Sequence, residues 1–163
     1  MSDDEEAVLA KWGSWDALYT YLDRLVRELS PVVCGHHTPV PTVEVKPTWL
    51  ARGLLGGQHS GADYEPAEGQ RPAVIGLFPA VLTDEALLRL VVAHELVHHW
   101  EHLGAQGADE LPSSDAAATI IAARFTNAQR ERRWRSGHSS YFIAKASSVA
   151  ATLGVQLRQL LFS

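Results

Sequence analysis

The feature that most constrains the fold is an apolar helix with histidines on the side expected to face the core. Over residues 83–102, apolar residues recur at three- and four-residue steps, the period of an amphipathic helix. Leu87, Val91, His94 and His98 fall on one stripe of this helix. Because that stripe is expected to face the core, a second element must close over the two histidines.

The run His94-Glu95-Leu96-Val97-His98 within this helix has the spacing of a metal site. Residues four apart share a helix face, so both imidazoles can reach one ion. Neutral imidazole suits zinc, and a catalytic zinc takes three protein ligands and a water. The pattern predicts Zn²⁺ held by His94 and His98, with Glu95 accepting a proton from the bound water as general base. The alternative is a helix whose histidines bind no metal.

The third ligand does not follow from this spacing. His102 continues the four-residue series, but it lies about 12 Å along the axis from His94 at a rise of about 1.5 Å per residue. One ion does not bridge that distance. His138, which opens the last predicted helix after Gly137, is the better candidate. From its position alone, a surface or capping role for His138 is an equal alternative.

Taken together, two motifs resemble the SprT-like metallopeptidases, the family that includes the Spartan proteases. In that family an HExxH helix is followed by a Gly-His-x-x-x-Phe element, and residues 137–142 read GHSSYF here. The resemblance covers roughly residues 42–154. It implies that His138 is the third zinc ligand, that the fold is a minimal zincin-like domain, and that the substrate is a protein or peptide.

The sequence departs from the family pattern at two places. The stretch over residues 101–137 is longer than usual and is predicted to hold an extra helix, and Ser-Ser-Tyr replaces the more typical Gly-Pro-Glu after His138. A competing resemblance is to the ImmA/IrrE-like gluzincins, regulatory enzymes that cut one particular protein. There an acidic residue of the next helix completes the site, which would be Asp115 here. An ordinary helix N-terminal acid is the alternative for Asp115.

The remaining patterns predict one α+β domain over residues 1–163. A helix is expected over residues 5–29, ended by Ser30-Pro31. Strands over residues 42–45 and 72–79 and a hairpin over residues 54–64 predict a small three-stranded sheet, expected to be antiparallel. Thr83 is expected to cap the histidine helix and Gly104 to end it. Further helices are predicted from residue 114 or 115 to about 135 and over residues 139–153, and an apolar tail, residues 155–162, is expected to dock on the body.

Several residues near the motif are candidates for supporting roles. Tyr64 and Tyr141 are each placed to donate a hydrogen bond to a transition-state oxyanion, with plain packing as the alternative. Glu101, His99 and His102 follow the motif directly and are candidates to hydrogen-bond the ligands. Ordinary surface placement is the alternative for these three residues.

Charge limits the expected partners. The formal net charge is -5 with the histidines neutral, which argues against a whole surface that grips nucleic acid. A local basic cluster that includes Trp134 is a candidate for DNA contact, and a solvated helix end is the alternative. The cluster comprises Arg124, Arg130, Arg132, Arg133 and Arg135. A non-catalytic, zinc-stabilised DNA-binding module is therefore a further hypothesis, although Glu95 would have no use in it.

Cysteine content and hydropathy indicate the compartment. The single cysteine, Cys34, rules out an internal disulfide and a cysteine-rich zinc module. No N-terminal run resembles a signal peptide, and no stretch approaches the length of a membrane span. We expect a cytoplasmic protein without membrane contact.

Overall fold

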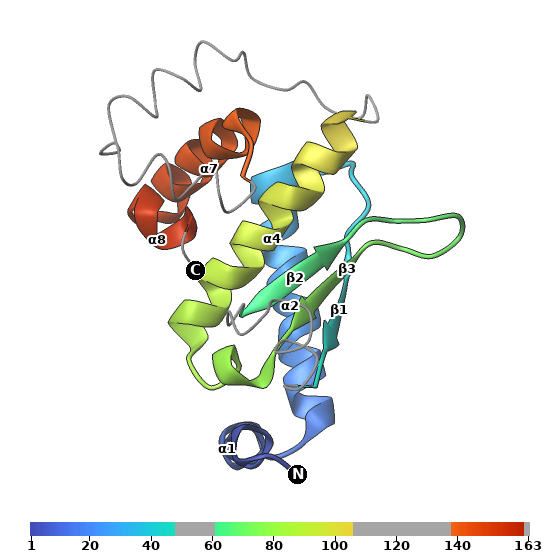
Figure 1. Cartoon of the computed structure of the whole chain (residues 1–163), viewed down its shortest axis with the longest axis vertical. Coiled ribbons are helices and arrows are strands. Elements are labelled where there is room, and N and C mark those ends of the chain that lie inside the picture. Colours follow the sequence, from blue (N-terminus) through green and yellow to red (C-terminus); the bar gives the residue numbers. More distant parts are fainter. Residues whose placement is uncertain (48–60, 106–137, 162–163) are drawn as a thin grey trace.

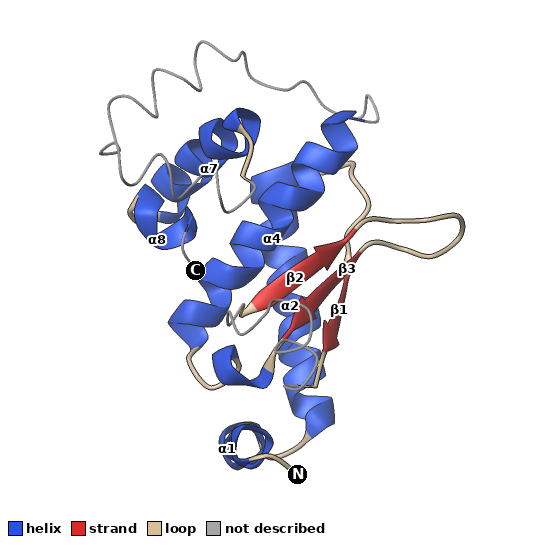
Figure 2. Ribbon diagram, in the orientation of Figure 1, coloured by secondary structure: helices blue, strands red, loops and turns tan. Residues whose placement is uncertain are grey.

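A computed structural model describes residues 1–47, 61–105 and 138–161 of the chain (Figure 1). This described part is α+β, as the sequence predicts, with five α-helices and one three-stranded sheet (Figure 2). In chain order the elements are α1 (Asp3–Trp12), α2 (Trp15–Cys34), β1 (Thr42–Val45), β2 (Ala62–Glu65), β3 (Val74–Leu77), a short 3₁₀ turn (Pro79–Val81), α4 (Glu85–Ala105), α7 (Ser140–Leu153) and α8 (Leu157–Leu161). The predicted helix over residues 114–135 and most of the predicted hairpin lie outside the described residues.

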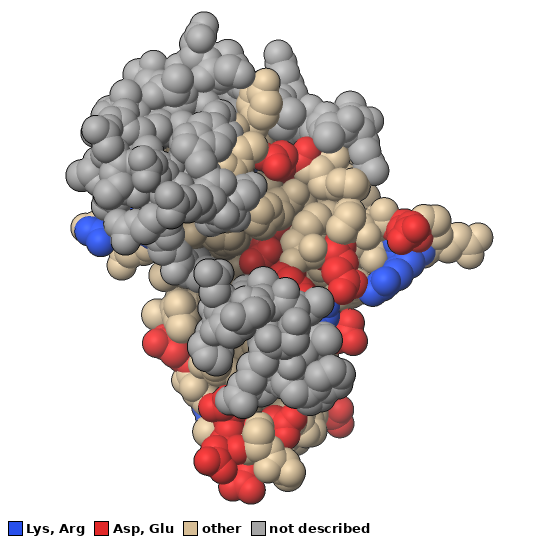
Figure 3. All heavy atoms as spheres, viewed as in Figure 1, with Lys and Arg blue, Asp and Glu red and all other residues tan. Residues whose placement is uncertain are grey.

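The N-terminal helix predicted over residues 5–29 is in fact two helices. Gly13 adopts φ 81°, and its amide donates to the Leu9 carbonyl at 2.8 Å to end α1. Ser14 then starts α2 by accepting from the Ala17 amide at 3.1 Å. The first turn of α1 is acidic, which suits the positive end of the helix dipole. Figure 3 shows acidic side chains gathered at this end of the molecule.

The prediction that Ser30-Pro31 ends this helical region is wrong. Helix α2 continues through Pro31 to Cys34 and stops at Gly35, which has φ 91°. Proline lacks an amide hydrogen and so removes one helical hydrogen bond. Several turns of helix already precede Pro31, and their buried leucines hold the helix in place. Glycine, with its access to positive φ, is the stronger stop signal here.

The sheet is mixed, so the expectation of an antiparallel sheet is wrong. The strand order is β1-β3-β2, with β3 parallel to β1 and antiparallel to β2. Strands β2 and β3 are joined by a short connection that includes a bridge between Glu68 and Arg71, and a short connection makes its strands antiparallel. The longer segment between β1 and β2 allows β1 to lie on the far edge of β3, running in the same direction.

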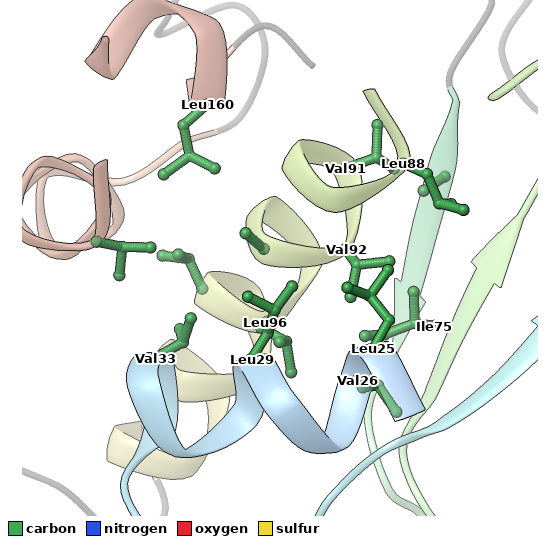
Figure 4. Close-up of a cluster of buried hydrophobic side chains, with 14 of the residues drawn as sticks. Leu25, Val26, Leu29, Val33, Ile75, Leu88, Val91, Val92, Leu96 and Leu160 are labelled. Atoms are coloured by element: carbon green, nitrogen blue, oxygen red, sulfur yellow. The ribbon is translucent and has the colours of Figure 1, made fainter. Parts of the chain in front are cut away.

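Helix α4 crosses the middle of the described structure. It packs against α2 and β2 on one side and against α7 and α8 on the other (Figure 1). Figure 4 shows the apolar contact between α2 and α4, where Leu29 lies beside Leu96. Because α4 touches both halves of the core, a polar side chain on it can meet groups from both the sheet and the C-terminal helices.

The ends of the C-terminal helices largely follow the sequence. Asp84, not the predicted Thr83, caps α4, since its Oδ1 accepts from the Leu87 amide at 3.0 Å. Helix α4 runs through Gly104 to Ala105. The predicted last helix is confirmed as α7, capped by Ser139 and ended by Gly154 in the left-handed conformation. The apolar tail docks as expected, because all three leucines of α8 are buried. Among the described residues, no helix has both the length and the apolar character needed to cross a membrane.

Candidate metal centre

Three histidines from two elements meet at one point. His94 and His98 lie one turn apart on α4, and His138 lies immediately before α7. One ring nitrogen from each lies within 4.8 Å of the others. The Nε2 atoms of His94 and His138 are 3.1 Å apart. Two nitrogens bound to one tetrahedral zinc at about 2.0–2.1 Å are roughly 3.3 Å apart, so this pair has a spacing that suits a shared ion. The donor set fits the predicted metal.

A backbone carbonyl orients the His94 ring. Nδ1 of His94 lies 2.7 Å from the Leu160 carbonyl oxygen in α8. Because a carbonyl only accepts, Nδ1 carries the hydrogen and Nε2 is left with a lone pair. His94 is 6% exposed, and burial lowers its pKa although the bond to Leu160 opposes this. The buried, neutral imidazole with Nε2 unprotonated is the form that binds a metal.

His98 stays neutral for a related reason. Burial lowers the pKa of His98 to about 3, with further contributions from His94 and His138. Bringing three imidazoles together disfavours any positive charge among them. Burial and the neighbouring rings thus favour the neutral form of His94 and His98, the form that can offer a lone pair to a metal.

A phenylalanine holds the three rings in place. Phe142 is fully buried in the first turn of α7. Its ring stacks on His138 with a centroid distance of 4.4 Å and an interplanar angle of 7°. The same ring lies 4.4 Å from His98 and 5.0 Å from His94. Phe142 thus forms an apolar floor under all three imidazoles.

Glu95 lies in the same cavity as the histidines. The cavity has a volume of about 290 Å³ and is lined by the three histidines and by Ala62, Asp63, Tyr64 and Glu95. Glu95 is 7% exposed. Burial raises the pKa of its carboxyl to about 8, and the nearby charge of Asp63 adds to the increase. Without a cation nearby this carboxyl is mostly protonated at neutral pH, and a positive ion among the histidines would lower its pKa and favour the ionised form that a general base needs.

Tyr64 lines the cavity, but its hydroxyl hydrogen is already engaged. Nε2 of His99 lies 2.8 Å from the Pro39 carbonyl oxygen and must donate to it. Burial lowers the pKa of His99 and keeps the ring neutral, so its Nδ1 is an acceptor. The Tyr64 hydroxyl lies 2.8 Å from this Nδ1 and donates to it. The predicted role of Tyr64 as an oxyanion donor therefore competes with a fixed structural bond.

The other candidate residues either do not line the cavity or lie outside the described residues. Tyr141, the second predicted oxyanion donor, is partly buried in α7 and is not among the described residues that line the cavity. His102 lies near Tyr64, with ring centroids 6.4 Å apart. Asp115 and the arginine cluster over residues 124–135 lie outside the described residues. Their predicted roles as metal ligand and DNA contact stay predictions.

Sequence reasoning missed an ion network beside the cavity. Lys46, at the end of β1, donates to Asp63 Oδ2 at 3.0 Å and to Glu65 Oε1 at 2.8 Å, both in β2. Its side chain passes over Gly76 of the central strand, where a Cβ atom would collide with it. Asp63 and Glu65 lie two apart, so they share one face of β2. The sequence did contain a signal for this network: two acidic residues alternate along one predicted strand, and a single lysine follows another.

Comparison with known proteins leaves the family resemblance untested. No family model, no curated protein and no solved structure matches this chain. The resemblance to SprT-like metallopeptidases therefore depends on residues 94–98 and 137–142 and on the geometry described above, and membership of that family stays a prediction.

Proposed function

We propose that the protein is a zinc-dependent metalloendopeptidase of the SprT-like type, with zinc held by His94, His98 and His138. The observation that carries this proposal is the convergence of three imidazoles beside the buried Glu95 side chain in one cavity. A site with three protein ligands keeps a position for water, as catalytic zinc sites do. When bound, the zinc would polarise the scissile carbonyl and lower the pKa of its water.

Glu95 has the proton-transfer role in this proposal. It takes the proton from the attacking water and delivers it to the amine that leaves. Its position supports the role, because Glu95 lines the same cavity as the three histidines and a cation bound there would favour its ionised form. A purely structural zinc site has no use for such a group, which argues against the non-catalytic module.

The shape of the site supports a peptide substrate. Strand β2 forms one edge of the described sheet, and its residues Ala62, Asp63 and Tyr64 line the cavity opposite α4. An extended peptide could lie along this wall of the cavity, with a peptide carbonyl toward the histidines.

The test is Glu95→Gln, assayed with a denatured, fluorescently labelled protein as substrate. We expect the variant to hold as much zinc as the unmodified protein and to cleave at least about 100-fold more slowly, the low end for loss of a general base. The matched control is Glu28→Gln, which changes an exposed glutamate paired with Arg89 at the surface. Full cleavage by Glu95→Gln would rule out this mechanism.

A further inference from the structure

One side-chain contact ties the start of α7 to α4 beside the metal centre. Ser139 caps α7, since its Oγ accepts from the Phe142 amide at 3.0 Å. The same hydroxyl donates its hydrogen to the carboxylate of Glu101, which lies on α4. We call this contact the Glu101–Ser139 clasp. Both hydrogen-bonding roles of the serine are thereby used.

We propose that Glu101 is a positioning residue of the metal centre, which holds His138 against His94 and His98 by way of Ser139. This inference rests on the proposed zinc function. Glu101 is correctly placed for such a role, because residues 94, 98 and 101 follow at steps of four and three and so share one face of α4. The carboxylate is thus on the same side of the helix as the two ligands that α4 supplies.

The clasp matters because His138 is far in the sequence from the other two proposed ligands. His138 and His94 are 44 residues apart in the sequence, so the third ligand is not held in place by the helix that carries the other two. Ordering such a ligand costs backbone and side-chain entropy. A hydrogen bond to a charged carboxylate is stronger than one between neutral groups. The clasp fixes the residue next to His138 before any metal arrives, so less entropy is lost on binding.

The clasp is not what docks α7 on the protein. Phe142, Ile143, Ala146 and Val149 of α7 are buried in the core. These apolar contacts hold the helix as a whole, and loss of one partly exposed hydrogen bond leaves them in place. Removal of the Glu101 carboxylate should therefore loosen the residues just before α7, where His138 lies, while the fold persists.

The first measurement is zinc affinity of the full chain, by competition with a chromophoric chelator. Glu101→Ala should weaken binding by about 10–100-fold, the usual effect of removing a group that orients a metal ligand. Glu101→Gln keeps an oxygen that accepts from Ser139 and should restore most of the affinity. Glu28→Ala is the matched control, because it removes an exposed glutamate that also contacts α4, through Arg89, and its zinc affinity should be unchanged.

The second measurement asks whether Glu101 acts through His138. Each variant is made in a His138→Ala background, and Co²⁺ is titrated while its visible absorption is followed. If Glu101 positions His138, Glu101→Ala has no further effect once His138 is gone. The proposal is overturned if Glu101→Ala weakens metal binding equally with and without His138, or if it does not weaken metal binding when His138 is present. Ser139→Ala removes both the clasp and the cap of α7, so it should weaken zinc binding at least as much as Glu101→Ala, and it replaces that variant if Glu101→Ala does not fold.

Failure of the clasp and failure of the proposed function give different results. A chain that binds zinc but cleaves no protein contradicts the peptidase, while the affinity comparison still decides the role of Glu101. A chain that binds no zinc at all contradicts both proposals. Normal zinc affinity in Glu101→Ala contradicts the clasp alone.

Discussion

At the scale of single residues, the site depends on which nitrogen of each histidine carries the hydrogen. The Leu160 carbonyl fixes the hydrogen of His94 on Nδ1, and the Pro39 carbonyl fixes that of His99 on Nε2. His94 thereby presents Nε2 to His138 and the histidine cluster, while His99 presents Nδ1 to Tyr64. Two histidines of one helix thus have different tasks because two distant carbonyls select different tautomers.

The tautomer of His99 leads to a prediction for Tyr64. Tyr64→Phe leaves the buried Nδ1 of His99 without its donor, so the free energy of unfolding should fall by about 1–3 kcal/mol. Cleavage should slow by much less than the roughly 100-fold expected for loss of an oxyanion donor. Denaturant unfolding measures the change in stability, and the turnover rate on the labelled protein substrate measures the change in cleavage.

The matched control for this prediction is Tyr19→Phe. The Tyr19 hydroxyl accepts from the Val45 amide at 3.1 Å in an exposed setting, where water replaces the lost partner. Its loss should affect stability less. If Tyr64→Phe instead slows turnover by about 100-fold or more while stability is unchanged, the oxyanion role belongs to Tyr64.

At the scale of elements, Lys46 joins two strands that do not pair with each other. Strand β3 separates β1 from β2, and the lysine reaches over it to two carboxylates. Burial alone lowers the pKa of Lys46, but its hydrogen bonds to Glu65 and Asp63 outweigh burial and raise that pKa. The hydrogen bond from Lys46 in turn lowers the pKa of Glu65. The network holds β2, and with it one wall of the cavity.

This network predicts a pH-dependent effect of Lys46→Met. The variant leaves two carboxylates facing each other, so at pH 7 the free energy of unfolding should fall by about 1–2 kcal/mol. This loss is smaller than that for breaking a fully buried ion pair, because Glu65 is partly exposed to solvent. The pKa of Glu65 is below its ordinary value of 4.5 in the folded protein. The stabilisation is therefore present above pH 4.5 and lost as the pH falls through the folded pKa.

Urea unfolding at pH 7 and near pH 3 measures this difference. The deficit of Lys46→Met should shrink at the lower pH, as Glu65 takes up protons. Arg71→Met is the control, since Arg71 pairs with Glu65 at the surface and its loss should change stability by less than about 1 kcal/mol. A deficit that is equal at both pH values would show that packing, not charge, explains the effect of Lys46.

The elements that the sequence predicted well are those with local signals. Helix α7 begins after a capping serine and ends at a glycine, and both signals lie within the helix's own sequence. The break between α1 and α2 was missed because Val8, Trp12, Trp15 and Leu18 keep the spacing of one continuous stripe across it. The direction of β1 was missed because strand patterns do not show which strand β1 pairs with, and β1 pairs with β3 rather than with β2, the next strand along the chain.

At the scale of the whole molecule, the site exists because α4 lies between two structural units. The sheet supplies Asp63 and Tyr64 on one side, and α7 and α8 supply His138 and the Leu160 carbonyl on the other. The spacing of four residues was enough to predict His94, Glu95 and His98. The prediction of His138 as the third ligand depended on a family resemblance. The role of Leu160 could not be predicted from the sequence, because Leu160 contributes its backbone carbonyl, which every residue has. Leu160 is 66 residues from His94 in the sequence, and only the packing of α8 brings the two together.

The most direct test of the central claim is zinc per chain, by elemental analysis, in the unmodified protein and in His138→Ala, both shown to be folded by circular dichroism. His36→Ala, which removes an exposed histidine away from the cavity, is the matched control. We predict one zinc per chain in the unmodified protein and in the control, and loss of most of it in His138→Ala. A His138→Ala protein that keeps its zinc would contradict the three-histidine centre and make Asp115 the next candidate ligand.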